Sequence, residues 1–112
     1  MSNSRTIIDE VGVGSPGDWL PNAHAGEILM SEFVEPLGLS LAALAESVGV
    51  NAGRVAEVIH GRSRISAELD LRLARYFGMS EGFFLRLQDS YELLEAKRAL
   101  NGALDRIVPR AA

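Results

Sequence analysis

Hydrophobic residues recur at helical spacing through the middle and the C-terminal part of this chain, and no stretch alternates convincingly as a β-strand would. The run from Ala25 to Glu35 places Ile28, Leu29 and Phe33 on one face. It stops at Pro36, which has no backbone N–H to continue the helical hydrogen bonds. This pattern predicts a first helix over Ala25–Glu35.

Two short helices are predicted next, with only three residues between them. The second helix covers Leu41–Val48, where apolar residues recur at i, i+3, i+4 and i+7, with Ser40 as its N-terminal cap. Gly49 follows it and suits a left-handed C-terminal turn. The third helix runs from Ala52 to about His60, with Asn51 as its cap.

Two further helices complete the predicted fold. Ser66 begins a fourth helix that Gly78 ends, and Ser80 begins a fifth that extends to Leu100. The residues expected to face inward are Leu69, Leu73, Tyr76 and Phe77 in the fourth helix, and Phe84, Leu87, Tyr91 and Leu94 in the fifth. The sequence therefore predicts an all-α fold of five helices.

Three segments differ in their content of helix-breaking residues. Residues 1–22 contain several Gly and Pro residues and no helical period, which favours a flexible N-terminal arm. Trp19 in this arm is expected to fold back onto the core, with a docking anchor for a partner as the alternative. Residues 23–100 hold the predicted helices, and residues 101–112 form a C-terminal tail with weak structure.

Composition narrows the class of protein. A chain of 112 residues with 47% apolar residues suits one folded domain. The absence of cysteine excludes a disulfide framework, a thiolate zinc site and a cysteine nucleophile. No apolar run of signal-peptide length occurs in the first twenty residues, and no eighteen apolar residues stand together. We therefore expect a soluble, cytoplasmic protein with no membrane partner.

The sequence carries no recognisable catalytic or metal-binding pattern. His24 and His60 are far apart, and neither has a second ligand at metal spacing. No glycine-rich phosphate loop follows a strand, and no Ser, His and Asp set is placed by spacing. We expect no enzyme activity, no catalytic residues, no metal and no cofactor.

The spacing of small and apolar residues across the second and third helices predicts a helix-turn-helix. Counted from Leu41, a small residue is needed at the fifth place and a glycine at the ninth, and Ala45 and Gly49 supply them. Apolar residues are needed at the fifteenth and eighteenth places, where Val55 and Val58 stand. The alternative is a corner between two helices in an unrelated helical protein.

If the third helix is a recognition helix, its outward side chains and the residues after it contact DNA. Arg54 is the expected base reader, because its planar fork can donate two hydrogen bonds to guanine. Arg62 and Arg64 would lie along the phosphate backbone. The other candidate contacts are Ser40, Asn51, Ala52, Gly53, Glu57 and His60. The net charge of −4 requires such a local patch, and residues 40–78 hold five Arg against four acids.

Residues 24–98 resemble the HigA-type antitoxins of the XRE-like helix-turn-helix superfamily. The resemblance lies in HAGEIL at residues 24–29, EFVEPLGLS at residues 32–40 and GVNAGRVAEVIHGRSRIS at residues 49–66. It continues in LRLARYFGMSEGFFLRLQDSYEL at residues 71–93, and this closing block distinguishes the family from generic XRE domains. The sequence departs from the family at Ala25, where Pro is common, at Phe84, where Trp is common, and at Gly53, which weakens the recognition helix.

The resemblance implies a lambda-repressor-like domain that forms a homodimer and represses its own operon by binding the operator DNA. It also implies a protein partner, a HigB or RelE-like toxin that cleaves messenger RNA. A ribonuclease should be basic, so the acidic residues of the N-terminal third are candidates for steering it. They are Asp9, Glu10, Asp18, Glu27, Glu32 and Glu35. Two alternatives remain: a solitary transcriptional regulator, and an antitoxin that acts by protein contact alone.

Overall fold

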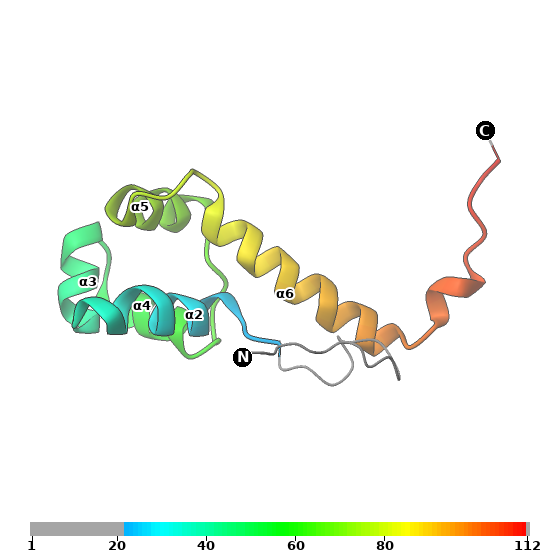
Figure 1. Cartoon of the computed structure of the whole chain (residues 1–112), viewed down its shortest axis with the longest axis horizontal. Coiled ribbons are helices and arrows are strands. Elements are labelled where there is room, and N and C mark those ends of the chain that lie inside the picture. Colours follow the sequence, from blue (N-terminus) through cyan, green and yellow to red (C-terminus); the bar gives the residue numbers. More distant parts are fainter. Residues whose placement is uncertain (1–21, 112) are drawn as a thin grey trace, which may run out of the picture. The chain divides into compact units, whose positions relative to one another are not determined.

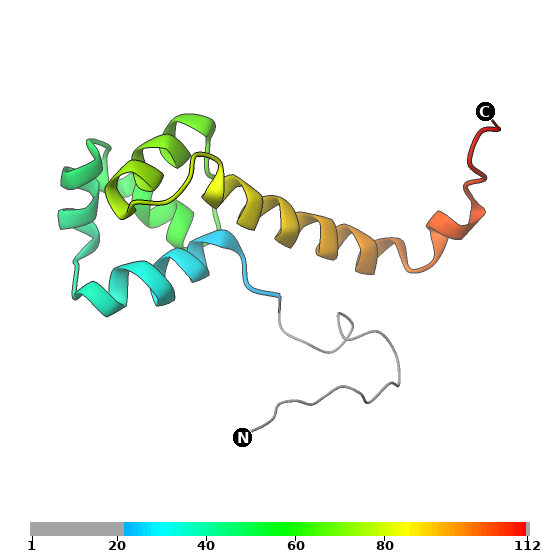
Figure 2. The ribbon, with the colours of Figure 1, turned by 45° about the horizontal axis from the view of Figure 1, so that its top comes forward.

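A computed structural model describes residues 22–111 of the protein, and all of its regular structure in this range is helical. The elements are α2 (Ala25–Ile28), the π-helix η2 (Leu29–Val34), the 3-10 helix η3 (Glu35–Leu37), α3 (Leu41–Val48), α4 (Ala52–Ile59), α5 (Ala67–Phe77), α6 (Phe83–Leu100) and the 3-10 helix η4 (Ala103–Arg106). Figures 1 and 2 show their course from two sides. The predicted all-α fold is confirmed, whereas the predicted arm and Trp19 lie outside the described residues, apart from residue 22.

The first predicted helix is not α-helical throughout. Only Ala25–Ile28 is an α-helix, and the next six residues form a wider π-helical turn before a 3-10 turn that carries Pro36. Leu29 and Val34, five residues apart, are both fully buried. Positions five apart point about 140° away from each other on an α-helix. The π turn therefore brings two side chains to the core that an α-helix would separate, which the α-helical period of the sequence could not show.

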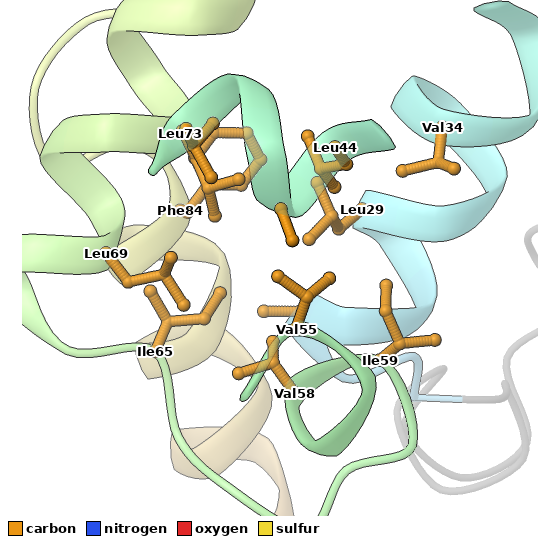
Figure 3. Packing of buried hydrophobic residues seen from close by; sticks show 13 residues of the cluster. Leu29, Val34, Leu44, Val55, Val58, Ile59, Ile65, Leu69, Leu73 and Phe84 are labelled. Carbon is orange, nitrogen blue, oxygen red and sulfur yellow. The ribbon is translucent and has the colours of Figure 1, made fainter. Parts of the chain in front are cut away.

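The hydrophobic core lies among α2 to α6 within one compact unit, residues 23–93. Figure 3 shows its labelled side chains, from η2, α3, α4, α5 and α6 and from Ile65 in the loop before α5, pointing toward one another. Most residues of the predicted apolar periods of α3 and α4 are buried, among them Leu44, Val55 and Val58 at 2% exposure or less, whereas Leu41 is only partly buried. Phe84 is completely buried and packs edge-on against Phe33, with ring centroids 5.2 Å apart. These contacts fix α4 against the rest of the unit.

Two expectations for the last two helices are wrong. Tyr76 of α5 is 42% exposed, because Leu69, Leu73 and Phe77 already follow the inward face at intervals of four residues and Tyr76 lies beside it. The fifth helix begins at Phe83 and not near Ser80, which instead accepts a hydrogen bond from Arg86 Nη2. Its inward face also includes a buried polar residue, Gln88, that the apolar pattern did not reveal.

A carboxylate from α5 takes the place of the expected cap of α6. Asp70 is 1% exposed, and its two oxygens accept hydrogen bonds from the backbone N–H groups of Gly82, Phe84 and Leu85 at 2.6 to 3.1 Å. The first N–H groups of a helix have no partner inside it, and a negative charge is favourable there. Asp70 thus fixes the start of α6 to α5.

The second compact unit contains the end of α6 and the residues after it. Asn22 donates a hydrogen bond to Glu95 at 3.1 Å, and Glu95 also pairs with Arg98 at 3.6 Å. The predicted tail includes η4, and its apolar residues Leu104, Ile107 and Val108 are exposed. No single helix in the described residues is long and apolar enough to cross a membrane; Ala25–Leu37 and Leu41–Val48 reach that size only when taken together, across a 97° bend.

Candidate nucleic-acid interface

The turn between α3 and α4 has the geometry that the spacing predicted. Gly49 ends α3 with a φ of 75°, in the left-handed region that residues with a Cβ rarely adopt. Ala45, which faces the crossing helix, is 2% exposed. Arg72 of α5 donates a hydrogen bond from Nη1 to the carbonyl oxygen of Val48 at 2.9 Å. The turn is therefore held from outside by a side chain 24 residues later in the chain.

Both predicted caps of the helix-turn-helix are present. Ser40 Oγ accepts a hydrogen bond from the N–H of Ala43 at 3.0 Å, and Asn51 Oδ1 accepts one from Gly53 at 2.7 Å. The two capping side chains are exposed, so the start of each helix faces solvent. Any role of Ser40 and Asn51 at a DNA surface would have to be compatible with these local hydrogen bonds.

The outer face of α4 is small near its start and polar near its end. Ala52 and Gly53 are exposed, and so are Glu57 and His60, four and seven residues after Gly53. The ring of His60 is held within the helix, because its Nδ1 hydrogen bonds the carbonyl oxygen of Ala56 at 2.8 Å. These residues form the part of α4 that is open to solvent.

Arg54 lies at the side of this face and not at its centre. Its side chain is half-buried, and Nη2 donates a hydrogen bond to Ser66 Oγ at 2.5 Å. Ser66 is the N-terminal cap of α5, so Arg54 bridges the start of α4 and the start of α5. A guanidinium carries five N–H donors, and this bond uses one of them. Arg54 therefore keeps further N–H donors while being held in place.

The segment after α4, residues 60–66, is called the exit loop below. Its two arginines have different surroundings. Arg62 is exposed, and its side chain has no hydrogen-bond or ion-pair partner among the described residues. Arg64 is bound to Glu92 of α6, with Nε at 2.6 Å and Nη2 at 2.9 Å from the two carboxylate oxygens. Asp89 lies 3.7 Å from the same guanidinium.

The ion pair between Arg64 and Glu92 changes both of their acidities. Hydrogen bonding to Glu92, reinforced by its negative charge, raises the pKa of Arg64. The hydrogen bond from Arg64 lowers the pKa of Glu92, with partial burial acting in the opposite direction. Both groups are charged at neutral pH, because each shift favours the charged form.

The position of α4 is fixed from its inner side by a close approach of backbone to backbone. Gly26 of α2 is buried, and a Cβ added there would lie 2.0 Å from the carbonyl oxygen of Val58. The start of α2 is set by His24, whose Nδ1 accepts hydrogen bonds from the N–H groups of Gly26 and Glu27. The glycine in the HAGEIL segment is therefore required because α2 and α4 touch there.

Four polar residues that support this surface were not predicted: Asp70, Arg72, Gln88 and Glu92. Each acts on a partner at least 12 residues away, so no local pattern reveals it. The one available signal is a polar residue at an inward helical position, as at Gln88, four residues after Phe84. Within the described part of the chain, no group of three or more His, Cys, Asp or Glu residues could hold a metal ion.

Comparison with known proteins agrees with this geometry. The family model described as helix-turn-helix matches residues 30–84. The chain is 39% identical to virulence-associated protein I of Dichelobacter nodosus over 79 residues, which are 70% of this chain and 73% of that protein. It is 35% identical to antitoxin HigA-1 of Vibrio cholerae over 72 residues, which are 64% of this chain and 68% of that protein.

A solved structure extends the likeness to the fold. The antitoxin HigA of Pseudomonas aeruginosa, determined with the higBA promoter, is 36% identical and superposes with a TM-score of 0.73. The alignment covers 81% of this chain and all of that one. The chain therefore belongs to the XRE-like helix-turn-helix family, in its HigA-type branch.

Proposed function

We propose that this protein is the antitoxin of a HigBA-type toxin-antitoxin pair and that it binds operator DNA in its own promoter through α4. The observation that carries the proposal is the α3–α4 corner, which leaves the outer face of α4 exposed with Arg54 held at its edge. The relative from Pseudomonas aeruginosa was determined with the higBA promoter, which supports DNA binding by this chain. Arg54 reads a base edge, and Arg62 contacts a phosphate.

Other candidate contacts would have smaller roles. Ala52 and Gly53 place little more than backbone at the surface, so they let the helix approach the duplex closely without reading many bases. Glu57 faces outward with a negative charge and accepts a hydrogen bond from Ser63 Oγ at 3.0 Å. A carboxylate near the groove accepts a hydrogen bond from cytosine and repels phosphate, so Glu57 favours sequence discrimination over affinity.

The experiment that tests DNA binding uses the full-length protein and a duplex from the promoter of its own gene. Fluorescence anisotropy at fixed salt should show much tighter binding to this duplex than to a scrambled one of equal length. Equal affinity for the two duplexes would contradict operator recognition and would favour an antitoxin that acts by protein contact alone. The stoichiometry of the complex tests whether the protein binds as a homodimer, because two copies should occupy two half-sites one helical turn apart.

The proposal also includes a toxin partner, a RelE-like ribonuclease that cleaves messenger RNA. Glu32 and Glu35 are exposed on the first helix, whereas Glu27 is partly used in the cap of α2, where it accepts the N–H of His24 at 3.0 Å. The acidic residues Asp9, Glu10 and Asp18 lie outside the described residues. A basic ribonuclease would be attracted to the exposed carboxylates of Glu32 and Glu35.

Co-expression with the toxin encoded beside this gene tests the partnership. The pair should purify together, and the antitoxin should block cleavage of a reporter messenger RNA. Replacing Glu32 and Glu35 with Lys should slow association, while Glu46→Lys on the exposed side of α3 serves as a control of equal charge change per site. DNA binding without any toxin interaction would instead identify a solitary regulator.

A further inference from the structure

The exit loop is fastened on both sides. Toward α4, the backbone N–H of Arg62 donates to the carbonyl oxygen of Glu57 at 2.8 Å, and Ser63 hydrogen bonds the Glu57 side chain. Toward α6, the buried Gln88 makes two hydrogen bonds to Ile65: its Oε1 accepts the N–H at 2.6 Å, and its Nε2 donates to the carbonyl oxygen at 3.0 Å. The loop thus connects the end of α4 to α6 through hydrogen bonds on both sides.

The ion pair of Arg64 is a second link between the exit loop and α6, one helical turn after Gln88. Gln88 and Glu92 are four residues apart, so they share one face of the helix, and they bind consecutive residues of the loop, Ile65 and Arg64. A phosphate that approached the Arg64 guanidinium would lie close to the carboxylates of Glu92 and Asp89, which would repel it. Arg62 has no such neighbour among the described residues.

We propose that Arg64 is an anchor of the exit loop and not a phosphate contact, and that Gln88 and Glu92 are positioning residues that set the pose of α4 on DNA. This inference rests on the proposed operator binding and concerns how that surface is held. An exposed ion pair contributes little to the free energy of unfolding, so the anchor acts on DNA affinity more than on melting temperature. Placement matters because a base contact depends on a short hydrogen bond in a fixed direction.

Exchanging the two charges separates an anchor from a phosphate contact. Arg64→Glu should weaken operator binding severalfold, because its carboxylate then faces those of Glu92 and Asp89. Glu92→Arg should lower the ratio of operator to scrambled-duplex affinity, because two guanidinium groups then meet across the loop. The double variant Arg64→Glu/Glu92→Arg restores an ion pair and should regain most of the wild-type affinity. If Arg64 contacts phosphate, the double variant keeps a carboxylate at the DNA and stays as weak as Arg64→Glu, which would overturn the proposal.

The variant Glu92→Gln provides a second test, because general electrostatics and the anchoring role predict opposite changes in operator affinity. Removing a negative charge from a DNA-binding protein should tighten binding through the general field. Loss of the anchor should weaken it and reduce the ratio of operator to scrambled-duplex affinity. Glu81→Gln is the matched control, because Glu81 is exposed and its carboxylate has no partner among the described residues. Tighter binding in both variants would overturn the proposal.

Both arms use the full-length protein, with circular dichroism melting to confirm that every variant folds. If the wild-type protein does not prefer the operator duplex, the proposed function itself is contradicted. If the wild-type protein prefers the operator but the double variant does not regain affinity, only the anchoring role is contradicted. The two failures are therefore distinguishable in one set of titrations.

Discussion

The two ends of the recognition helix α4 are built differently. Its leading turn, residues 51–54, carries small exposed residues and is fixed by a local cap from Asn51 and by one hydrogen bond of Arg54. The exit loop at the other end, residues 60–66, is held by Gln88 and Glu92, which lie on a different helix. The comparison teaches that the leading turn depends on a local cap and one hydrogen bond to Ser66, whereas the opposite end is held by several contacts to a distant helix.

The largest expected effect is at Gly26, where the backbone of α2 lies against the end of α4. Gly26→Ala would place a Cβ 2.0 Å from the Val58 carbonyl oxygen, a distance that real Cβ atoms do not reach. The two helices would have to separate, which should lower the free energy of unfolding by about 3 kcal/mol. Urea denaturation measures this change.

The matched control is the same substitution in the leading turn. Gly53→Ala also adds a Cβ at a helical position, but the nearest atom is the Asn51 Oδ1 at 2.9 Å, at the end of a side chain. The gain of about 0.5 to 1 kcal/mol in helix preference offsets disturbance of the cap, so the net change should stay small. Equal stability of the two alanine variants would contradict the close approach of α2 and α4.

The difference between these ends also explains what the sequence could reveal. Caps at Ser40 and Asn51 and the left-handed residue Gly49 were predictable because each follows from residue types within four positions, even though Arg72 also contacts the turn. The contacts of Gln88 and Glu92 could not be predicted, because their partners are 23 and 28 residues away. The spacing of apolar residues within one helix gives no sign of such contacts. The π-helical turn at residues 29–34 was not predicted, because Ile28, Leu29 and Phe33 fit the α-helical period, whereas the burial of Val34, five residues after Leu29, does not.

The leading turn is expected to carry base recognition. Arg54→Ala should weaken binding to the operator by about 10- to 100-fold, because one bidentate base contact contributes about 1 to 3 kcal/mol of discrimination. Affinity for a scrambled duplex should change much less, and the helical circular dichroism signal should be retained.

Ser66→Ala is the control for Arg54, since it removes the hydrogen bond that holds the guanidinium but leaves its donors. This variant should cost some stability through loss of the α5 cap and should reduce operator affinity less than Arg54→Ala. If Arg54→Ala binds the operator as tightly as the wild type, Arg54 does not contact a base.

The two arginines of the exit loop should respond differently to salt. Arg62→Ala should reduce the slope of log affinity against log salt by about one unit, as expected for one lost phosphate contact. Arg64→Ala should lower operator affinity with little change of slope, because its guanidinium is already paired with Glu92. A loss of slope in Arg64→Ala equal to that in Arg62→Ala would place both residues on the phosphate backbone.

The smallest expected effect is the titration of the anchor itself. The hydrogen bond from Arg64 holds the pKa of Glu92 below the ordinary glutamate value, although partial burial opposes it. Because the folded pKa is the lower one, the pair stabilises the folded protein fully above the unfolded pKa, and this stabilisation is lost as pH falls through the folded pKa. The side-chain carboxyl carbon of Glu92, followed by NMR, should titrate below the ordinary range in the wild type and return toward it in Arg64→Ala. Arg62→Ala should leave this midpoint where it is, since Arg62 does not pair with Glu92. A midpoint that is insensitive to Arg64 would mean that the ion pair does not persist in solution, and the exit loop would then be held by Gln88 alone.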